Sequence, residues 1–329
     1  MPTSSTAIAP NALAALMAPD MARVDEVILK RLASDVALVN QISHYIIAAG
    51  GKRIRPMLVL LFSGALGFGG SARYELAATV EFIHTATLLH DDVVDESALR
   101  RGRQTANALF GNAASVLVGD FVYSRAFQMM VSVGSMRVLE VLADATNVIA
   151  EGEVLQLMNV HDPDLSVEDY LRVIRFKTAK LFEASARLGA VLAGAESAVE
   201  ESCAGYGRAL GTAFQLVDDL LDYEGATEQL GKNVGDDLRE GKPTLPLLLA
   251  MERGTAAERS LIRAAIETGE VAKLPEIVDI VRRTGALDAT REAARLEAQK
   301  ARDCLGPIPE SKQREALLEL CVRSVERSF

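Results

Sequence analysis

The chain has 329 residues, of which 49% are hydrophobic, so it can bury a sizeable core in one large domain or two ordinary ones. Its formal net charge of −10 argues against general nucleic-acid binding, and we expect no nucleic-acid partner. The three cysteines are few, widely spaced and odd in number, which indicates neither a disulfide framework nor a zinc site. This cysteine usage is typical of a reducing cytoplasm.

Residues 1–20 lack a basic start and a long apolar run, so they do not resemble a signal peptide. We expect them to form a flexible tail that precedes one folded domain over residues 21–329. The most apolar stretch, residues 57–70, contains several glycines and is shorter than the roughly 20 residues that a bilayer-spanning helix needs. We therefore expect a soluble, cytoplasmic protein without a transmembrane segment.

Helical periodicity dominates the chain, whereas the alternation typical of strands is scarce. Helices are predicted near residues 22–49, 52–66, 72–98, 112–131, 136–158, 167–194, 198–223 and 243–252, with more toward the carboxyl terminus. Breaks are predicted at 50–51, 67–70, 101–102 and 162–163, and in the polar stretch 225–242. The pattern predicts an all-α fold, a single-domain bundle of helices that can enclose a central cavity.

Two copies of the spacing DDxxD are the strongest chemical signal. Their aspartates are Asp91, Asp92, Asp95, Asp218, Asp219 and Asp222. On a helix, residues i and i+4 share a face, so like charges repel there by a few tenths of a kcal/mol. Apolar flanks place both clusters at the rim of a core, where unpaired carboxylates are costly. A cation should offset that cost, and hard oxygen ligands of this kind suit Mg²⁺.

Either DDxxD copy alone could equally be a solvated acidic face, because short motifs often occur without function. Two copies, each within an apolar helix, favour a metal site. If the two helices face each other across a cavity, their carboxylates could hold several ions around one diphosphate.

Residues 50–56, with the sequence GGKRIRP, form a glycine-led turn that opens a helix. Backbone amides at a helix amino terminus favour an anion, and Lys52, Arg53 and Arg55 add positive charge. An ordinary basic helix start is the alternative if the motif stood alone. His84 lies seven residues before Asp91 on nearly the same helix face, although a lone histidine on an apolar helix is more often a core residue.

Other polar residues stand near the two aspartate clusters. Arg100 and Arg101 follow the first cluster by about two turns and could contact a diphosphate, although for Arg100 a helix carboxyl terminus favouring cations is the slightly preferred interpretation. Taken alone, each of the lysines Lys177, Lys232 and Lys242 could be an ordinary surface lysine. Gln156 and Gln215 stand in apolar helices and need hydrogen-bond partners. The remaining candidates are Lys177, Thr178, Lys232 and Lys242.

Taken together, these motifs resemble the trans-isoprenyl diphosphate synthases. The resemblance extends from Asp20 to Leu249 and rests, in chain order, on GGKRIRP, LLHDDVVDE…LRRG, GEVLQL, FKTAKLF, FQLVDDLLDY and GKPT. It implies an all-helical homodimer with a long apolar tunnel below the aspartates. It also implies a prenyltransferase that condenses isopentenyl diphosphate onto an allylic diphosphate, with farnesyl diphosphate the expected primer, and supplies a quinone side chain.

The resemblance also implies a role for each candidate. All six aspartates would bind Mg²⁺, two or three ions per site with Mn²⁺ as a substitute. The allylic diphosphate would be contacted by Arg100, Lys177, Lys232 and Lys242. Isopentenyl diphosphate would be held by Lys52, Arg55, His84 and Arg101. The reacting centre would be lined by Thr178 and Gln215.

Chain length follows from helix geometry if the product grows from Asp91 toward the amino terminus of the same helix. Ala86 lies about 7.5 Å from Asp91 at a rise of roughly 1.5 Å per residue, and it and Thr87 are too small to close the tunnel there. The floor must then lie deeper. The resemblance implies that the helices of three further candidates lie beside the tunnel, although the methionines among them could be ordinary core residues; they are Met129, Met130 and Leu142. The resemblance favours a product of about eight isoprene units, but helix geometry does not separate eight from nine or ten.

Three other functions remain open. A short-chain synthase is disfavoured by Ala86, and a non-catalytic partner subunit would be expected to lose an aspartate cluster. A terpene cyclase would not need the GGKRIRP site for a second diphosphate. Because the product is very apolar, we also expect transient membrane contact on its release.

Overall fold

The computed structural model describes residues 12–48, 50–100, 102–224 and 235–326. The first helices are α1 (Ala12–Leu32), α2 (Ala37–Ala48), α3 (Ile54–Ala65), α4 (Ala72–Val94), α5 (Ala106–Phe110), α6 (Asn112–Ser132) and α7 (Met136–Asn159). Next come α8 (Val167–Ile174), the π-helical η1 (Arg175–Ala179), α9 (Lys180–Leu192) and α10 (Ser197–Glu224). The last are α12 (Asp236–Arg239), α13 (Leu245–Arg253), α14 (Ala256–Thr268), α15 (Leu274–Arg283), α16 (Ala286–Asp303) and α17 (Lys312–Val325). The predicted all-α fold class is confirmed.

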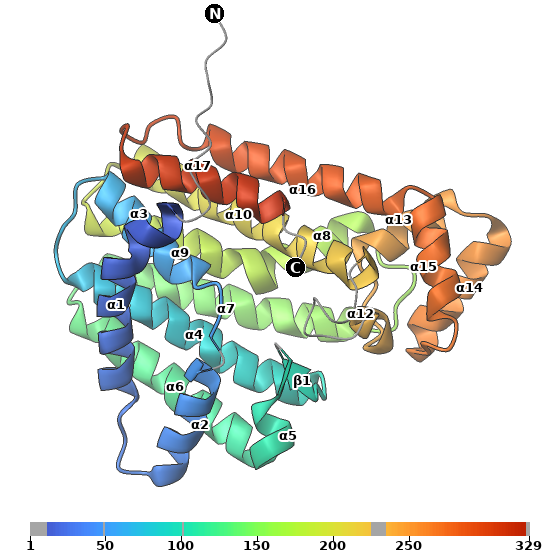
Figure 1. The fold of residues 1–329 in the computed structure, drawn as a ribbon, viewed down its shortest axis with the longest axis horizontal. Coiled ribbons are helices and arrows are strands. Elements are labelled where there is room, and N and C mark those ends of the chain that lie inside the picture. The colour runs from blue at the N-terminus through green and yellow to red at the C-terminus, as the bar shows by residue number, and fades with distance from the viewer. Residues whose placement is uncertain (1–11, 49, 101, 225–234, 327–329) are drawn as a thin grey trace, which may run out of the picture.

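Helix α10 is the centre of the bundle. It packs along α9 on one side and α16 on the other, while α4 packs along α6 (Figure 1). Buried apolar side chains form a larger cluster that includes α1, α3, α4, α6, α7 and α9, and a smaller one around α13 to α16. Helix α10 contributes to both, because its first half packs into the larger cluster and its last turns into the smaller.

The amino-terminal helix differs from its prediction. The single helix predicted over 22–49 is two helices, and the first begins at Ala12, inside the segment predicted to be a flexible tail. Leu13 and Met17 lie on one face of α1 and are buried in the core, which explains the earlier start. The break follows from a local closure: the side chain of Asn40 accepts from the amide of Ser34 at 3.0 Å and donates to its carbonyl at 2.6 Å.

The predicted helix over 72–98 ends early, at Val94. The chain turns at Glu96, which has a positive φ of 50°, and enters a hairpin of two short strands that no sequence signal predicted. In this hairpin β1 (Leu99–Arg100) pairs antiparallel with β2 (Arg103–Gln104). Arg100 therefore lies on a strand and not at a helix carboxyl terminus.

The predicted helix over 167–194 contains a π-helical interruption, η1, between α8 and α9. A π-bulge adds a residue to a turn and shifts the direction of the side chains that follow, and such bulges are frequent at functional sites. Two of the residues in η1 are the candidates Lys177 and Thr178. Helical periodicity alone did not predict this change of winding.

The other predicted helices agree with α3, α6, α7, α10 and α13 to within a few residues. The polar stretch 225–242 was predicted to be a break; its residues 225–234 lie outside the described part of the chain, and the rest contains α12. Among the described residues, no helix combines the length and the apolar character that crossing a bilayer requires.

Replacing Met17 by Ala should lower the free energy of unfolding by about 2–5 kcal/mol, because the substitution removes a buried side chain from the core. Urea denaturation measures this change. The exposed Ala15 on the same helix offers a matched control, since Ala15→Ser should change stability by less than about 0.5 kcal/mol. Equal stability of both variants would support the flexible tail instead.

Candidate active site

The first aspartate cluster lies where α4 ends. Asp91 and Asp92 belong to its last turn, and Asp95 is the residue that follows the helix, with its amide donating to the carbonyl of Asp91 at 2.8 Å. Asp91 and Asp95 line a large cavity, as the shared helix face predicted. Asp92 is 1% exposed and turns away from the cavity.

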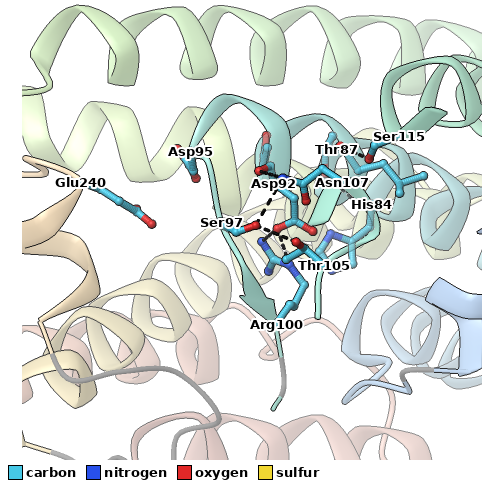
Figure 2. A network of polar contacts seen from close by, with 12 residues as sticks. His84, Thr87, Asp92, Asp95, Ser97, Arg100, Thr105, Asn107, Ser115 and Glu240 are labelled. Atoms are coloured by element: carbon cyan, nitrogen blue, oxygen red, sulfur yellow. Dashed lines mark hydrogen bonds and ion pairs between the residues drawn. The ribbon is translucent and has the colours of Figure 1, made fainter. Parts of the chain in front are cut away.

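Behind the cavity, Asp92 is the anchor of a polar network that Figure 2 shows. Arg100 donates to its Oδ1 from Nε at 2.9 Å and from Nη2 at 2.6 Å. Asn107 donates to the carbonyl oxygens of Asp92 at 3.0 Å and of Ser97 at 3.3 Å, and the Thr105 hydroxyl donates to the latter at 2.6 Å. These bonds hold the hairpin against the end of α4 and fix the direction of the first cluster.

Two lysines from distant elements reach the first cluster. The ammonium of Lys177 lies 3.7 Å from Asp91 and donates to Glu153 at 2.6 Å. The ammonium of Lys242 lies 2.9 Å from Asp95 and 2.6 Å from Glu240. Each lysine thus joins one predicted aspartate to a glutamate that the sequence did not single out. Asp91, Asp95, Glu153 and Lys242 line the charged end of the cavity, its mouth.

Burial controls the protonation of this group. It raises the pKa of Asp91, which the ammonium of Lys177 opposes, and it raises the pKa of Glu153 to about 6. For Lys242, burial disfavours the charged form, but the carboxylates of Asp95 and Glu240 outweigh it and raise its pKa above the usual value. Lys242 therefore carries its positive charge at neutral pH.

A glycine explains how Lys177 comes so close to α7. A β-carbon at Gly152 would lie 2.6 Å from the backbone nitrogen of Lys177, too close for any other residue without a shift of η1. Gly152 of the GEVLQL motif thus allows the backbone of η1 to pack directly against α7. Glu153 and Gln156 both line the cavity. Glu153 follows Gly152 directly, and this position is the sequence signal that could have identified Glu153 as a site residue.

The second aspartate cluster occupies the last turns of α10. Asp219 is buried, and it accepts hydrogen bonds from the hydroxyl of Tyr170 and from Gln215 at 2.7 Å. Burial, with the nearby charge of Asp237, raises the pKa of Asp219 to about 7. Asp218 is exposed, and Asp222 accepts from the amide of Asp237 at 3.2 Å. The middle aspartate therefore turns inward in both clusters.

Two chains of contacts join the clusters, and the spacing of residues in the sequence could not show either of them. One passes from Asp91 through Lys177 and η1 to Thr178, whose hydroxyl donates to Gln215 at 2.9 Å on the helix of the second cluster. The predicted neighbours Thr178 and Gln215 are thus in contact. The other chain passes from Asp95 through Lys242 and its segment to Asp222. Of the described residues that line the cavity, none belongs to the second cluster.

The predicted site for a second diphosphate lies at the start of α3. The ammonium of Lys52 stands 5.6 Å from the centre of the Phe214 ring, and the guanidinium of Arg55 stands 4.5 Å from that of Phe182. Arg53, which follows Lys52, adopts a left-handed φ of 51° and pairs with Glu81 at 3.2 Å. Arg101 and Lys232 lie outside the described residues, and His84 stands near the Asp92 network (Figure 2).

The cavity measures about 950 Å³ and runs between α4, α6 and α7. Below Asp91 its wall includes Thr87 and Ile83, about one and two turns toward the amino terminus of α4, so it follows the predicted direction. Tyr123 on α6 and Thr146 on α7 line it as well. The other predicted chain-length residues are buried in the core and are not among the described residues that line it; they are Ala86, Met129, Met130 and Leu142.

The donor set at the mouth suits a hard divalent cation. Among the described residues, no three carboxylate, histidine or cysteine side chains converge on one point. Mg²⁺ does not require such a cage, because it is usually bound by one or two carboxylates together with substrate phosphates and water. Asp91 and Asp95, side by side at the cavity mouth, fit that description.

Sequence comparison places the chain in a family. Residues 36–281 match the polyprenyl synthetase model, so the chain belongs to the polyprenyl synthetase family, and it is a prenyltransferase as predicted. It is 58% identical to the octaprenyl diphosphate synthase of Escherichia coli (strain K12), over 95% of this chain and 97% of that protein. It is 45% identical to the all-trans-nonaprenyl-diphosphate synthase (geranyl-diphosphate specific) of Rhodobacter capsulatus, over 94% and 96%.

A solved structure agrees with this assignment. The polyprenyl synthase of Caulobacter crescentus CB15, crystallised with calcium and isoprenyl diphosphate, superposes with a TM-score of 0.94 at 49% identity and covers 100% of both chains. The resemblance that the motifs indicated is confirmed, and the match to the Escherichia coli protein covers 95% of the chain.

Replacing Glu153 by Gln should stabilise the metal-free protein at about pH 8, by up to about 2 kcal/mol, and not near pH 4.5. The folded pKa of about 6 exceeds the ordinary value of 4.5, so as pH rises through this window the unfolded state loses its proton first and the wild type loses stability. Glutamine does not ionise and escapes this cost. Thermal unfolding in chelator across this pH range measures the difference.

The exposed Glu151 on the same helix supplies the control, because Glu151→Gln should show no such dependence on pH. A constant difference between Glu153→Gln and wild type at every pH would contradict the raised pKa.

Proposed function

We propose that the chain extends an allylic diphosphate by repeated addition of isopentenyl diphosphate and releases octaprenyl diphosphate. The observation that carries this proposal is a cavity of about 950 Å³ whose mouth bears Asp91, Asp95 and Lys242 and whose depth is lined by Ile83 and Ile149. Charged groups at one end and apolar ones at the other match a substrate with a diphosphate head and a growing hydrocarbon tail. The 58% identity to an octaprenyl diphosphate synthase supports the product length.

We infer that the allylic diphosphate binds at the mouth with Mg²⁺. Asp91 and Asp95 would hold the ions on one side, and Asp218 and Asp222 would serve from the other. When bound, the ions would supply Lewis-acid polarisation of the diphosphate oxygens. The inward-facing Asp92 and Asp219 would support these carboxylates through their hydrogen bonds and not through direct ligation, which revises the six-ligand expectation.

The lysines at the mouth would stabilise the departing diphosphate. Lys177 and Lys242 already stand beside Asp91 and Asp95, so their charge is in place before the reaction. Preorganised charge of this kind often provides the largest single contribution to catalysis. When the carbon–oxygen bond breaks, its electron pair leaves with the diphosphate and an allylic cation remains in the cavity, near apolar side chains such as Ile83 and Ile149.

Isopentenyl diphosphate would be held on the side of α3 by Lys52 and Arg55. Its double bond attacks the allylic cation and forms the new carbon–carbon bond, and the step gains from the proximity of the two bound substrates. Thr178 and Gln215, in contact with each other beside Lys177, would line this reacting centre. Loss of a proton to the released diphosphate restores a double bond in the extended product.

The cavity below Asp91 would receive the growing chain. With farnesyl diphosphate, isopentenyl diphosphate and Mg²⁺, the purified protein should form a product of about eight isoprene units, and chelation should abolish it. Thr87→Phe should stop growth early, because Thr87 is about one turn below Asp91, whereas Thr146→Phe should allow a longer product. Chromatography of the dephosphorylated products measures both lengths.

The order of the two variants tests the direction of the tunnel. Unchanged product length in both would contradict growth into this cavity. A dominant product of four units from the wild type would contradict the long-chain assignment.

We also propose that two copies of the chain associate through α6 and α7. These helices carry many of the large apolar side chains that the structure leaves exposed, among them Leu117 at 67%, Val131 at 62% and Met136 at 71%. Exposed apolar groups gathered in this way mark association surfaces in soluble proteins. Homodimers are the commonest assemblies, which supports a second copy as the partner.

Leu117→Glu should convert a dimer to a monomer in light scattering at micromolar concentration, because it would bury a charge in the interface. Leu296→Glu is the matched control, since Leu296 is 56% exposed but lies on α16, which is not part of the proposed interface. Loss of the dimer in both variants, or in neither, would exclude this interface.

A further inference from the structure

His161, one residue after the carboxyl-terminal cap of α7, has an uncommon conformation. Its φ is 64°, in the left-handed region that residues with a side chain rarely adopt, although histidine and asparagine occur there more often than most. His161 also lines the cavity, beside Arg239, Glu240 and Lys242. A strained backbone at the rim of an active site requires contacts that hold it.

Three segments meet at this histidine. Its amide donates to the carbonyl of Gly241 at 2.8 Å, and its ring Nδ1 lies 2.8 Å from the carbonyl oxygen of Ile266 in α14, so the ring donates from Nδ1. Gly241 has a φ of 68°, and a β-carbon there would lie 2.2 Å from the same ring nitrogen. The ring therefore sits directly against the backbone of the turn and ties it to α7 and α14.

The turn that His161 holds is the one that carries Lys242. The amide of Lys242 donates to the carbonyl of Asp237 at 2.8 Å, and its ammonium lies 2.9 Å from Asp95. Figure 2 shows Glu240, from the same turn, directed toward Asp95. The other end of this segment is held by Asp222. Its backbone carbonyl accepts a hydrogen bond from the amide of Gly235 at 3.1 Å, and its carboxylate accepts one from the amide of Asp237 at 3.2 Å.

We propose that His161 is a positioning residue that places Lys242 against Asp95 at the cavity mouth. Asp222 holds the start of the segment 235–242, and the ring of His161 lies against the backbone of Gly241, directly before Lys242. The turn's glycine cannot provide stiffness, so the histidine ring and its bond to Ile266 provide it. The proposal rests on the proposed function only in that Lys242 acts on the allylic diphosphate.

A double-mutant cycle in the full-length enzyme tests the proposal. His161→Ala should lower kcat/KM for the allylic diphosphate by about 10- to 100-fold, because a displaced lysine no longer meets the diphosphate. The KM for isopentenyl diphosphate should stay within about twofold of wild type, since Lys52 and Arg55 are not attached to this turn. In a Lys242→Ala background, His161→Ala should cost less than about twofold more.

His161→Asn is the matched control. Asparagine accepts the left-handed backbone and has a side-chain amide that can donate to a carbonyl, so this variant should recover most of the lost activity. Equal losses from His161→Ala in both backgrounds, or no loss in either, would overturn the positioning role.

Hydrogen exchange gives a readout that does not depend on turnover. In His161→Ala the amide of Lys242 should exchange faster, while that of Val118 in the core of α6 should not change. Unchanged exchange at Lys242 would also overturn the proposal, even where the variant is too unstable to assay. If the wild type failed to make a polyprenyl product, the proposed function would fall while the exchange result still decided the role of His161.

Discussion

The structure depends on keeping carboxylates at the rim of an apolar cavity. Asp91, Asp95 and Glu153 are gathered at this rim, where burial raises the pKa of Asp91 and of Glu153. Without compensation this arrangement would be strongly destabilising. Compensation comes from Lys177 and Lys242, which arrive from two different elements. A site balanced in this way is prepared to exchange contacts when a diphosphate and its cations enter.

The two aspartate clusters share one feature. In each, the middle carboxylate is buried and held by donors from a neighbouring element, Arg100 for Asp92 and Tyr170 for Asp219. This anchoring helps to fix the direction of the neighbouring carboxylates. In a solvated acidic face, no such donors would hold the carboxylates in place. The hairpin after α4 carries Arg100 and the helix α8 carries Tyr170, so these two elements bring the donors into place.

Backbone geometry, and not only side-chain chemistry, brings the lysines to the mouth. Lys177 stands on the π-helical segment η1, which lies against α7 where Gly152 leaves room for it. Lys242 stands on a turn whose glycine is packed against the ring of His161. Both lysines are therefore placed by contacts between elements, and small displacements of these backbones would misalign the charge.

The sequence by itself determined the helical fold, the two acidic clusters and the identity of most candidate residues, because helical periodicity and the DDxxD spacing are local properties. It also indicated the family, since GGKRIRP and the two aspartate motifs occur in a characteristic order. Only the tertiary structure decided which aspartates face the cavity, that Arg100 pairs with Asp92, and that Glu153 and His161 belong to the site. It also placed Thr146 and not Leu142 in the cavity wall. These facts depend on where helices distant in sequence touch, on a π-bulge and on left-handed turns, and no local pattern of residues specifies such contacts.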